Sequence, residues 1–312
     1  MEFVNELFDK SRFTNVDLFI CTISYEDRST YLFEHLSDKL DSDNTIVFAT
    51  DNYMQFVRAR QKIDQISAAG YVPRIVKYQD YENALSSIRK AVERIIEEKS
   101  SLSVFVDYSS MPRAWYCRLP MLFQEILRRD DRVYFWYAEG CYEGDYQNYP
   151  TAGIDAFVLF SGRPALLAKH RVHVLGLGYD FVRTQGIISI IDPEYMILME
   201  SHDASRTDVA ENVANANESL MAQAAMTVSL ELSDFTFMVS KLCEIAYEYA
   251  GISEVILVPD GPKPLIMAMS LIPDLIKSQG IACLHVTRNY EQFAPARVTA
   301  SGKVIGFSIT FS

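Results

Sequence analysis

The first half of the chain alternates short apolar runs with amphipathic segments. Residues 16–24 (VDLFICTIS) are almost continuously apolar, a pattern typical of a strand buried on both faces. In residues 81–99, apolar side chains from Leu85 to Ile95 recur at spacings of three and four, which predicts an amphipathic helix. The strands predicted in this half are 16–24, 45–50, 72–78, 102–107 and 132–137, and the predicted helices are 29–40, 52–69, 81–99 and 112–129. This alternation favours a parallel, doubly wound sheet.

Residues 139–164 interrupt the alternation with glycines, prolines and aromatic residues. We place a domain boundary at the end of this stretch, which gives an N-terminal domain of residues 1–164 and a C-terminal domain of residues 165–312. The alternation then restarts. The second half has predicted strands at 171–177, 195–199, 227–232, 254–258 and 281–286, and predicted helices at 208–224, 235–250 and 263–278.

The last residues carry the pattern of a closing β-hairpin. Two short β-prone segments, 297–299 and 304–310, flank a Ser301-Gly302 turn. The fold class expected for the whole chain is therefore α/β, with two tandem Rossmann-like doubly wound sheets and a C-terminal β-hairpin.

Two short segments recur in both halves and suggest an internal duplication. Tyr25 follows the first predicted strand of one half, and Tyr179 follows the first predicted strand of the other. Asp107 ends a later predicted strand of the first half, and Asp260 follows a later strand of the second half. Tyr25 and Tyr179 are 154 positions apart, and Asp107 and Asp260 are 153 positions apart.

Composition narrows the classes of partner. The chain has 49% hydrophobic and 22% charged residues, as in an ordinary packed protein. A net charge of −12 argues against an extended nucleic-acid backbone as partner, because such binding requires a basic excess. No basic leader or long apolar segment indicates export or a membrane span, so the cytoplasm is expected. The five cysteines are scattered without a CxxC pair, and no metal site is expected.

The segment after the fourth predicted strand is the most suggestive for chemistry. Asp107 is a strand-terminal carboxylate, Ser109 and Ser110 can cap a helix or contact phosphate, and Arg113 suits bidentate phosphate binding. Ligands of doubly wound sheets bind at this edge, beyond the carboxyl ends of the strands. The alternative is purely structural: a serine N-cap followed by a solvated arginine.

The loop after the first strand is the second candidate. Tyr25, Glu26 and Arg28 stand at the end of a strand that commonly neighbours the one carrying Asp107, so the two loops are expected to share a pocket. Glu26 or Asp27 would then act as a general base or hold a ribose, and Arg28 would contact phosphate. The alternative is an acidic first helical turn, which is favourable in any helix.

In the second half, Asp260 and Lys263 offer a tight turn and a lysine at a helix start, again suited to phosphate.

The sequence lacks GxxxxGK[ST], GxGxxG, HExxH and GxSxG motifs, so the common NTPase, dehydrogenase, zinc-protease and α/β-hydrolase interpretations have no support. A lone GxG at 176–178 is too short to indicate a dinucleotide site.

The placement of residues 107–110 and 259–264 after late strands of Rossmann-like units resembles the CRISPR-associated Rossmann fold (CARF) group. That resemblance implies a sensor of cyclic oligonucleotides that works as a homodimer, with ligand loops at these strand ends. It also implies a role in prokaryotic antiviral defence.

Three functions remain open from the sequence. The first is a sensor or regulatory module that binds a nucleotide-like ligand through Arg28, Ser109, Ser110 and Arg113. The second is an enzyme acting on a nucleotide or phosphorylated metabolite, with Glu26 or Asp107 as acid or base. The third is a subunit that regulates a protein partner through its acidic surface. No cofactor is indicated.

Overall fold

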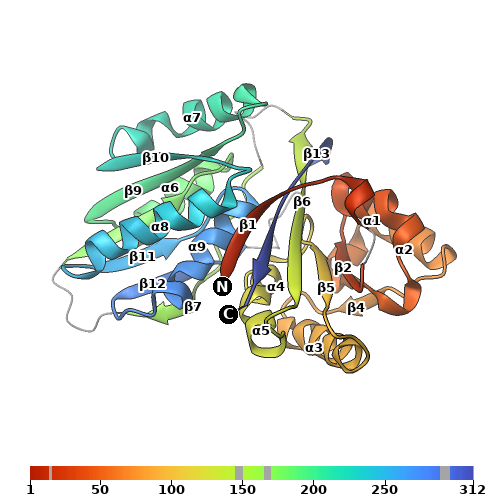
Figure 1. The fold of residues 1–312 in the computed structure, drawn as a ribbon. Helices are drawn as coiled ribbons and strands as arrows, with labels where there is room; N and C mark the ends of the chain where they lie inside the picture. The colour runs from red at the N-terminus through yellow and green to blue at the C-terminus, as the bar shows by residue number, and fades with distance from the viewer. Residues whose placement is uncertain (14–15, 145–149, 165–169, 289–295, 312) are drawn as a thin grey trace. The chain divides into compact units, whose positions relative to one another are not determined.

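The chain folds into two compact units, one of Met1–Glu143 with Arg297–Ser312 and the other of Gly144–Ala296. The structure is a computed structural model that describes residues 1–13, 16–144, 150–164, 170–288 and 296–311. Each unit has its own β-sheet flanked by helices (Figure 1).

The first unit is built on a seven-stranded sheet with the order β1-β13-β6-β5-β2-β3-β4. Its strands are β1 (Glu2–Leu7), β2 (Leu18–Ile23), β3 (Thr45–Thr50), β4 (Arg74–Val76), β5 (Ser103–Asp107), β6 (Arg132–Tyr142) and β13 (Val298–Thr310). The five neighbouring strands β6, β5, β2, β3 and β4 pair in parallel. Strand β13 is antiparallel to both of its neighbours, β6 and β1. Every residue of β2 is buried, because this central strand is covered on both faces.

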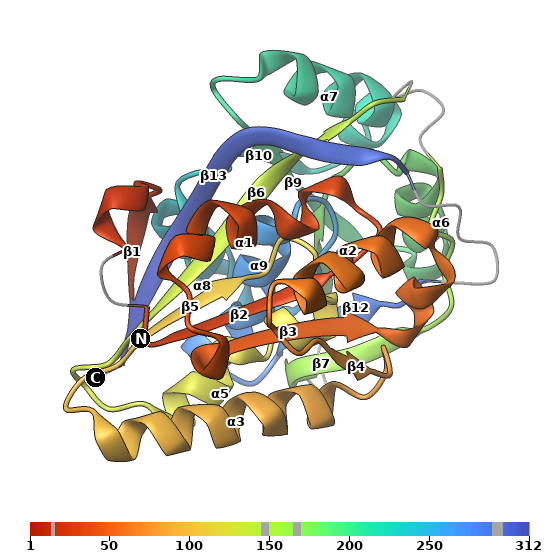
Figure 2. The same ribbon diagram turned by 90° about the vertical axis from the view of Figure 1, so that its right-hand side faces the viewer.

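Helices cover both faces of this sheet (Figure 2). On one face lie α1 (Tyr31–Leu36) and α2 (Val57–Ala68), and on the other lie α3 (Tyr81–Glu98), α4 (Arg113–Tyr116) and α5 (Leu119–Ile126). Short 3-10 turns follow two strands, η2 (Asp27–Thr30) after β2 and η5 (Asp51–Gln55) after β3. The remaining 3-10 turns are η1 (Lys10–Arg12), η3 (Ser37–Lys39) and η4 (Ser42–Asn44).

The second unit is built on a six-stranded sheet with the order β10-β9-β8-β11-β12-β7. Its strands are β7 (Phe157–Arg163), β8 (Arg171–Gly176), β9 (Tyr195–His202), β10 (Met226–Glu231), β11 (Glu254–Val258) and β12 (Ile281–Val286). Its helices are α6 (Phe181–Ile191), α7 (Thr207–Met221), α8 (Phe235–Ala250) and α9 (Lys263–Ile276). Only β7 is antiparallel among the strands described in this sheet.

The two units share one topology. In each, five parallel strands follow the order 3-2-1-4-5, which is that of a Rossmann sheet without its sixth strand, and an antiparallel strand is added beside the fifth. The predicted pair of tandem Rossmann-like sheets is confirmed. A shared strand order is also what an internal duplication requires.

The predicted division of the chain at residue 164 is corrected by the sheet pairing. Strand β7, placed by the prediction in the first domain, pairs with β12 of the second sheet. Strand β13 returns to the first sheet and pairs with β6. The predicted C-terminal hairpin is also wrong, because residues 298–310 form one strand that passes through an irregularity between Ala300 and Val304. Local turn residues could not reveal that the strand's partner lies far back in the sequence.

Several helix predictions also change. The predicted helix 112–129 is split into α4 and α5, with Pro120 in the first turn of α5. Helix α6 was not predicted, because Gly186 and several β-branched residues mask its pattern; Asp180 caps it by accepting a hydrogen bond from the Arg183 N–H. Among the described residues, no helix is both long and apolar enough to cross a membrane.

The second unit is an insertion between two paired strands of the first. Tyr142 and Val298 are opposite each other in the β6–β13 ladder. The chain leaves the first unit just after Tyr142 and returns to it just before Val298.

We expect that replacing residues 144–296 with a Gly/Ser turn of about four residues leaves a first unit that still folds, since such a turn spans an antiparallel pair. Cooperative urea unfolding followed by circular dichroism would test this. A shortened chain without a cooperative transition would contradict it.

A buried histidine in β8 should make stability depend on pH. His173 is 4% exposed, and burial together with the Arg171 guanidinium lowers its pKa. The unfolded chain therefore binds this proton more readily than the folded one. Above about pH 6.5, His173 is neutral in both states and does not change the stability. Below that pH, the unfolded chain takes up the proton first, so the free energy of unfolding falls as the pH decreases. In urea titrations between pH 5 and 7.5, a His173→Leu variant should show a smaller pH slope than the wild type; equal slopes would contradict the assignment.

Candidate functional site

The loops after β2 and β5 meet at the carboxyl edge of the first sheet. These strands are hydrogen-bonded neighbours. The Ser110 hydroxyl, from the β5 loop, donates a hydrogen bond of 3.3 Å to Oε2 of Glu26, from the β2 loop. The structure thus brings together the two loops that the sequence singles out.

Arg28 is the centre of the contacts that hold the β2 loop. Its side chain is 8% exposed, and its Nε donates to Glu26 Oε2 over 2.8 Å. Its Nη1 donates to the Tyr137 hydroxyl over 2.8 Å and to the Ala138 carbonyl over 3.2 Å, both on β6. Burial alone would lower the pKa of this guanidinium, but Glu26 and Tyr137 raise it above its ordinary value, so it stays charged. Arg28 therefore fastens the β2 loop to β6.

Asp107 and Ser109 are equally engaged inside the protein. They are 2% and 0% exposed, and the Ser109 N–H donates to Asp107 Oδ1 over 2.9 Å. The Ser109 hydroxyl also donates to this carboxylate and accepts from the Ala138 N–H over 2.7 Å. Contact between a ligand and Arg28, Asp107 or Ser109 would require these loops to rearrange. In this structure the three residues position the loops.

Tyr25 and Arg113, unlike Arg28, Asp107 and Ser109, have partly exposed side chains at this edge of the sheet. Tyr25 follows β2, and Arg113 is the first residue of α4; both are partly exposed. Ser110 is 5% exposed, and its hydroxyl faces Glu26. Tyr25 and Arg113 are therefore the sequence-predicted residues best placed to touch a ligand, with Ser110 and Glu26 beneath the point where the two loops meet.

An aromatic cluster that the sequence analysis did not identify surrounds Tyr25. Its ring lies 5.3 Å from that of Tyr53 in an edge-to-face arrangement and 4.9 Å from that of Phe56. Tyr53 in turn lies 6.5 Å from Tyr78, which follows β4. All four side chains are half-buried. The sequence signal was available, because each ring stands just beyond or near the end of a predicted parallel strand.

Helix α2 supports the same loop from the other side. Lys62 Nζ donates to the Glu26 carbonyl and, over 3.0 Å, to the Ser29 hydroxyl. Burial lowers the pKa of Lys62, and the Asp27 and Glu26 carboxylates oppose that shift. The β2 loop is thus held between α2 and β6.

The second unit repeats the buried arginine. Arg183 has a side chain 2% exposed, and its Nε lies 3.2 Å from Asp260 Oδ2. Its Nη2 donates to the Val286 carbonyl at the end of β12 over 2.7 Å. Arg183 thus joins the first turn of α6, which follows the first parallel strand, to the end of the fifth strand, whereas Arg28 contacts Tyr137 and Ala138 within the fifth strand of its own unit. Asp260 is therefore an ion-pair partner, and Lys263, half-buried at the start of α9, is the remaining candidate of this unit for a ligand contact.

Glycines bring the two strand-end loops of the second unit into backbone contact. A Cβ at Gly176 would lie 2.2 Å from the Asp260 carbonyl oxygen, and one at Gly178 would lie 2.9 Å from Gly261 Cα. Gly261 has φ of +89°, a conformation that favours glycine. The GxG at 176–178 therefore serves loop packing. The corresponding loops of the first unit meet instead through the side chains of Ser110 and Glu26.

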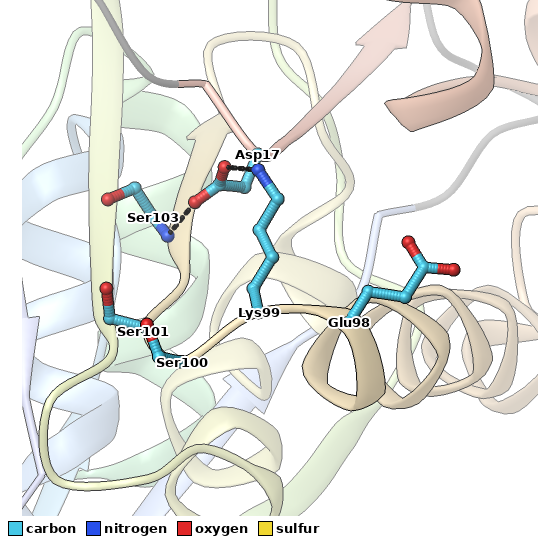
Figure 3. Close-up of a pocket in the computed structure, with 6 residues that line it drawn as sticks. All are labelled: Asp17, Glu98, Lys99, Ser100, Ser101 and Ser103. Atoms are coloured by element: carbon cyan, nitrogen blue, oxygen red, sulfur yellow. Dashed lines mark hydrogen bonds and ion pairs between the residues drawn. The ribbon is translucent and has the colours of Figure 1, made fainter.

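A polar pocket of about 410 Å³ lies at the opposite, amino-terminal edge of β2 and β5 (Figure 3). It is lined by Asp17, Glu98, Lys99, Ser100, Ser101 and Ser103. The Asp17 carboxylate pairs with Lys99 Nζ and accepts a 2.8 Å hydrogen bond from the Ser103 N–H. These contacts tie the residue just before β2 to the end of α3 and to the start of β5, which is a structural role. Among the described residues, no cluster of His, Cys, Asp and Glu is arranged to hold a metal ion.

No family model matches the chain, and no curated protein matches it either. Among solved structures, the cytoplasmic domain of a prokaryotic cation chloride cotransporter is similar, with 8% sequence identity and a TM-score of 0.25. The match covers 88% of this chain and 96% of that one. A likeness at this TM-score carries no argument about function, which rests on the strand-end geometry.

The glycine contact can be tested with a matched pair of substitutions in the second unit. Gly176→Ala places a methyl group against backbone, so the free energy of unfolding should fall by about 1–3 kcal/mol. Gly251→Ala adds a Cβ with nothing within 4 Å at an allowed φ of −72°, so it should be neutral or stabilising by about 0.4–1 kcal/mol. Chemical denaturation of both variants measures the difference. Equal effects would show that the loops do not pack this closely.

Proposed function

We propose that the first unit is a sensor or regulatory module that binds a nucleotide-like ligand at the carboxyl ends of β2, β3 and β5. The observation that carries the proposal is the half-buried aromatic cluster of Tyr25, Tyr53, Phe56 and Tyr78 at the strand ends, with Arg113 at the start of α4, which follows the β5 loop. Planar bases stack on such rings, and a guanidinium binds phosphate.

The charge of the chain fits a small ligand better than a polymer. A net charge of −12 opposes a long phosphate backbone. A single mononucleotide or short cyclic oligonucleotide needs only a local cation, which Arg113 supplies. The resemblance of the strand-end loops to the CARF group supports the same ligand class and suggests a prokaryotic defence context.

Binding without turnover is the favoured mode. The two carboxylates expected to act as acid or base are both engaged within the protein: Glu26 by Arg28 and Ser110, and Asp107 by Ser109. A general base must reach the proton it removes. These two carboxylates instead hold the loops that frame the site.

We expect a nucleotide that fits the site to raise the melting temperature of the wild type and to bind Arg113→Ala at least tenfold more weakly, because a charge-assisted hydrogen bond is lost. Tyr25→Ala should weaken binding as well, through lost stacking of about 1–3 kcal/mol per base. Thermal shift followed by calorimetry would measure this, with AMP, NAD and cyclic oligoadenylates as probes.

The matched control is Arg129→Ala, which removes an exposed arginine just before β6, at the opposite edge of the sheet. It should bind every probe as the wild type does. If no probe shifts the wild type, or if Arg113→Ala and Arg129→Ala bind equally, the proposed ligand site is wrong.

A further inference from the structure

The insertion of the second unit makes one end of the β6–β13 ladder a stem. Residues 140–142 pair with residues 298–300, and both connections to the second unit leave from this end. We call these three pairs the outer stem. If these pairs open or shift, both chain segments that lead to the second unit are displaced with them.

A bulge separates the outer stem from the rest of the ladder. Regular pairing breaks between Ala300 and Val304, and Gly302 in the gap has φ of +87°. The Tyr31 hydroxyl donates to the Gly302 carbonyl over 3.1 Å. Beyond the bulge, residues 304–310 pair continuously with residues 132–138. Bulges locally disrupt a ladder and bend the strand, so the outer stem is not continuous with the regular hydrogen bonding of the long ladder.

Arg28 lies at the junction between the two parts. Its guanidinium donates to the Ala138 carbonyl, in the last pair of the long ladder, and packs against Gly140, in the first pair of the outer stem. A Cβ at Gly140 would lie 2.9 Å from Arg28 Nη1 and 2.4 Å from Val298 Cγ1. The absence of a side chain at Gly140 is what lets the guanidinium reach this position.

The residue beside Arg28 extends the connection. Asp27 lies 4.0 Å from the guanidinium of Arg297, which in turn pairs with Glu143 over 2.9 Å. Arg297 is the residue at which the chain re-enters the first unit, and Glu143 is the residue at which it leaves. The turn η2 therefore contacts the outer stem through Arg28, and contacts Arg297, the residue just before the stem strand, through Asp27.

We infer that Glu26, Asp27 and Arg28 form a relay that couples the strand-end site to the outer stem and so to the inserted unit. The site end is the Ser110–Glu26 hydrogen bond, and the stem end is the contact of Arg28 with Ala138 and Gly140. This inference rests on the proposed function for its signal, but the coupling is a property of the ligand-free protein. A ligand that displaces Ser110 or Glu26 would alter the support of the stem.

Hydrogen exchange of the full-length, ligand-free protein tests the relay. Glu26→Gln keeps the shape of the side chain but removes the charge that faces Arg28, so exchange in residues 139–143 and 297–301 should quicken at least about tenfold. Exchange in residues 304–309 should stay as in the wild type. Glu125→Gln is the matched control: it makes the same change at an exposed pair with Arg89 in the same unit, and should leave the stem unchanged.

Ser110→Ala is the second variant, in case Glu26→Gln also quickens exchange in the long ladder. It removes the contact on the site side and should quicken exchange in the outer stem alone by about threefold or more. Wild-type exchange of the outer stem in both variants would overturn the relay, as would quickening by Glu125→Gln to the same degree. Because no ligand is used, this failure is distinct from a failure of nucleotide binding in calorimetry.

Discussion

The buried guanidinium of Arg28 fixes the geometry on which the N-terminal site depends. A cation in the protein interior is tolerated only when a carboxylate and further acceptors surround it, and Glu26, Tyr137 and the Ala138 carbonyl meet that requirement. Satisfying the cation forces the β2 loop against β6. The loop that carries Tyr25 is therefore held in place by electrostatics as well as by packing.

The second unit also has a buried arginine paired with a carboxylate, but its strand-end loops pack differently. Arg183, in the first turn of α6, also joins the segment after the first parallel strand to the fifth strand, but its carboxylate partner, Asp260, comes from the β11 loop. Glycines then let the β8 and β11 loops touch through their backbones. In the first unit the equivalent loops touch through side chains, and half-buried aromatic rings lie beside them. One architecture thus carries one strand edge packed through backbone and one edge with half-buried aromatic rings, where the ligand site is proposed.

The contacts of Asp27 and Arg28 also lie beside the point where the second unit is inserted. The strands that lead to and from the second unit are paired with each other, and they end beside the turn that contains Arg28. A contact that shapes the strand-end site therefore also supports the stem. The proposed ligand site and the base of the inserted unit therefore rely on the same few hydrogen bonds and ion pairs.

The sequence by itself determined the two Rossmann-like halves, because strands buried on both faces and helices with one apolar face leave clear periodic patterns. It also placed Tyr25, Glu26 and Ser110 at one sheet edge, since the carboxyl ends of parallel strands converge. Only the tertiary structure decided that Arg28 and Ser109 face inward, that Tyr53 packs against Tyr25 and that β13 returns to the first sheet. Those outcomes depend on which distant groups satisfy a buried charge or an unpaired strand, and no local pattern records the partner.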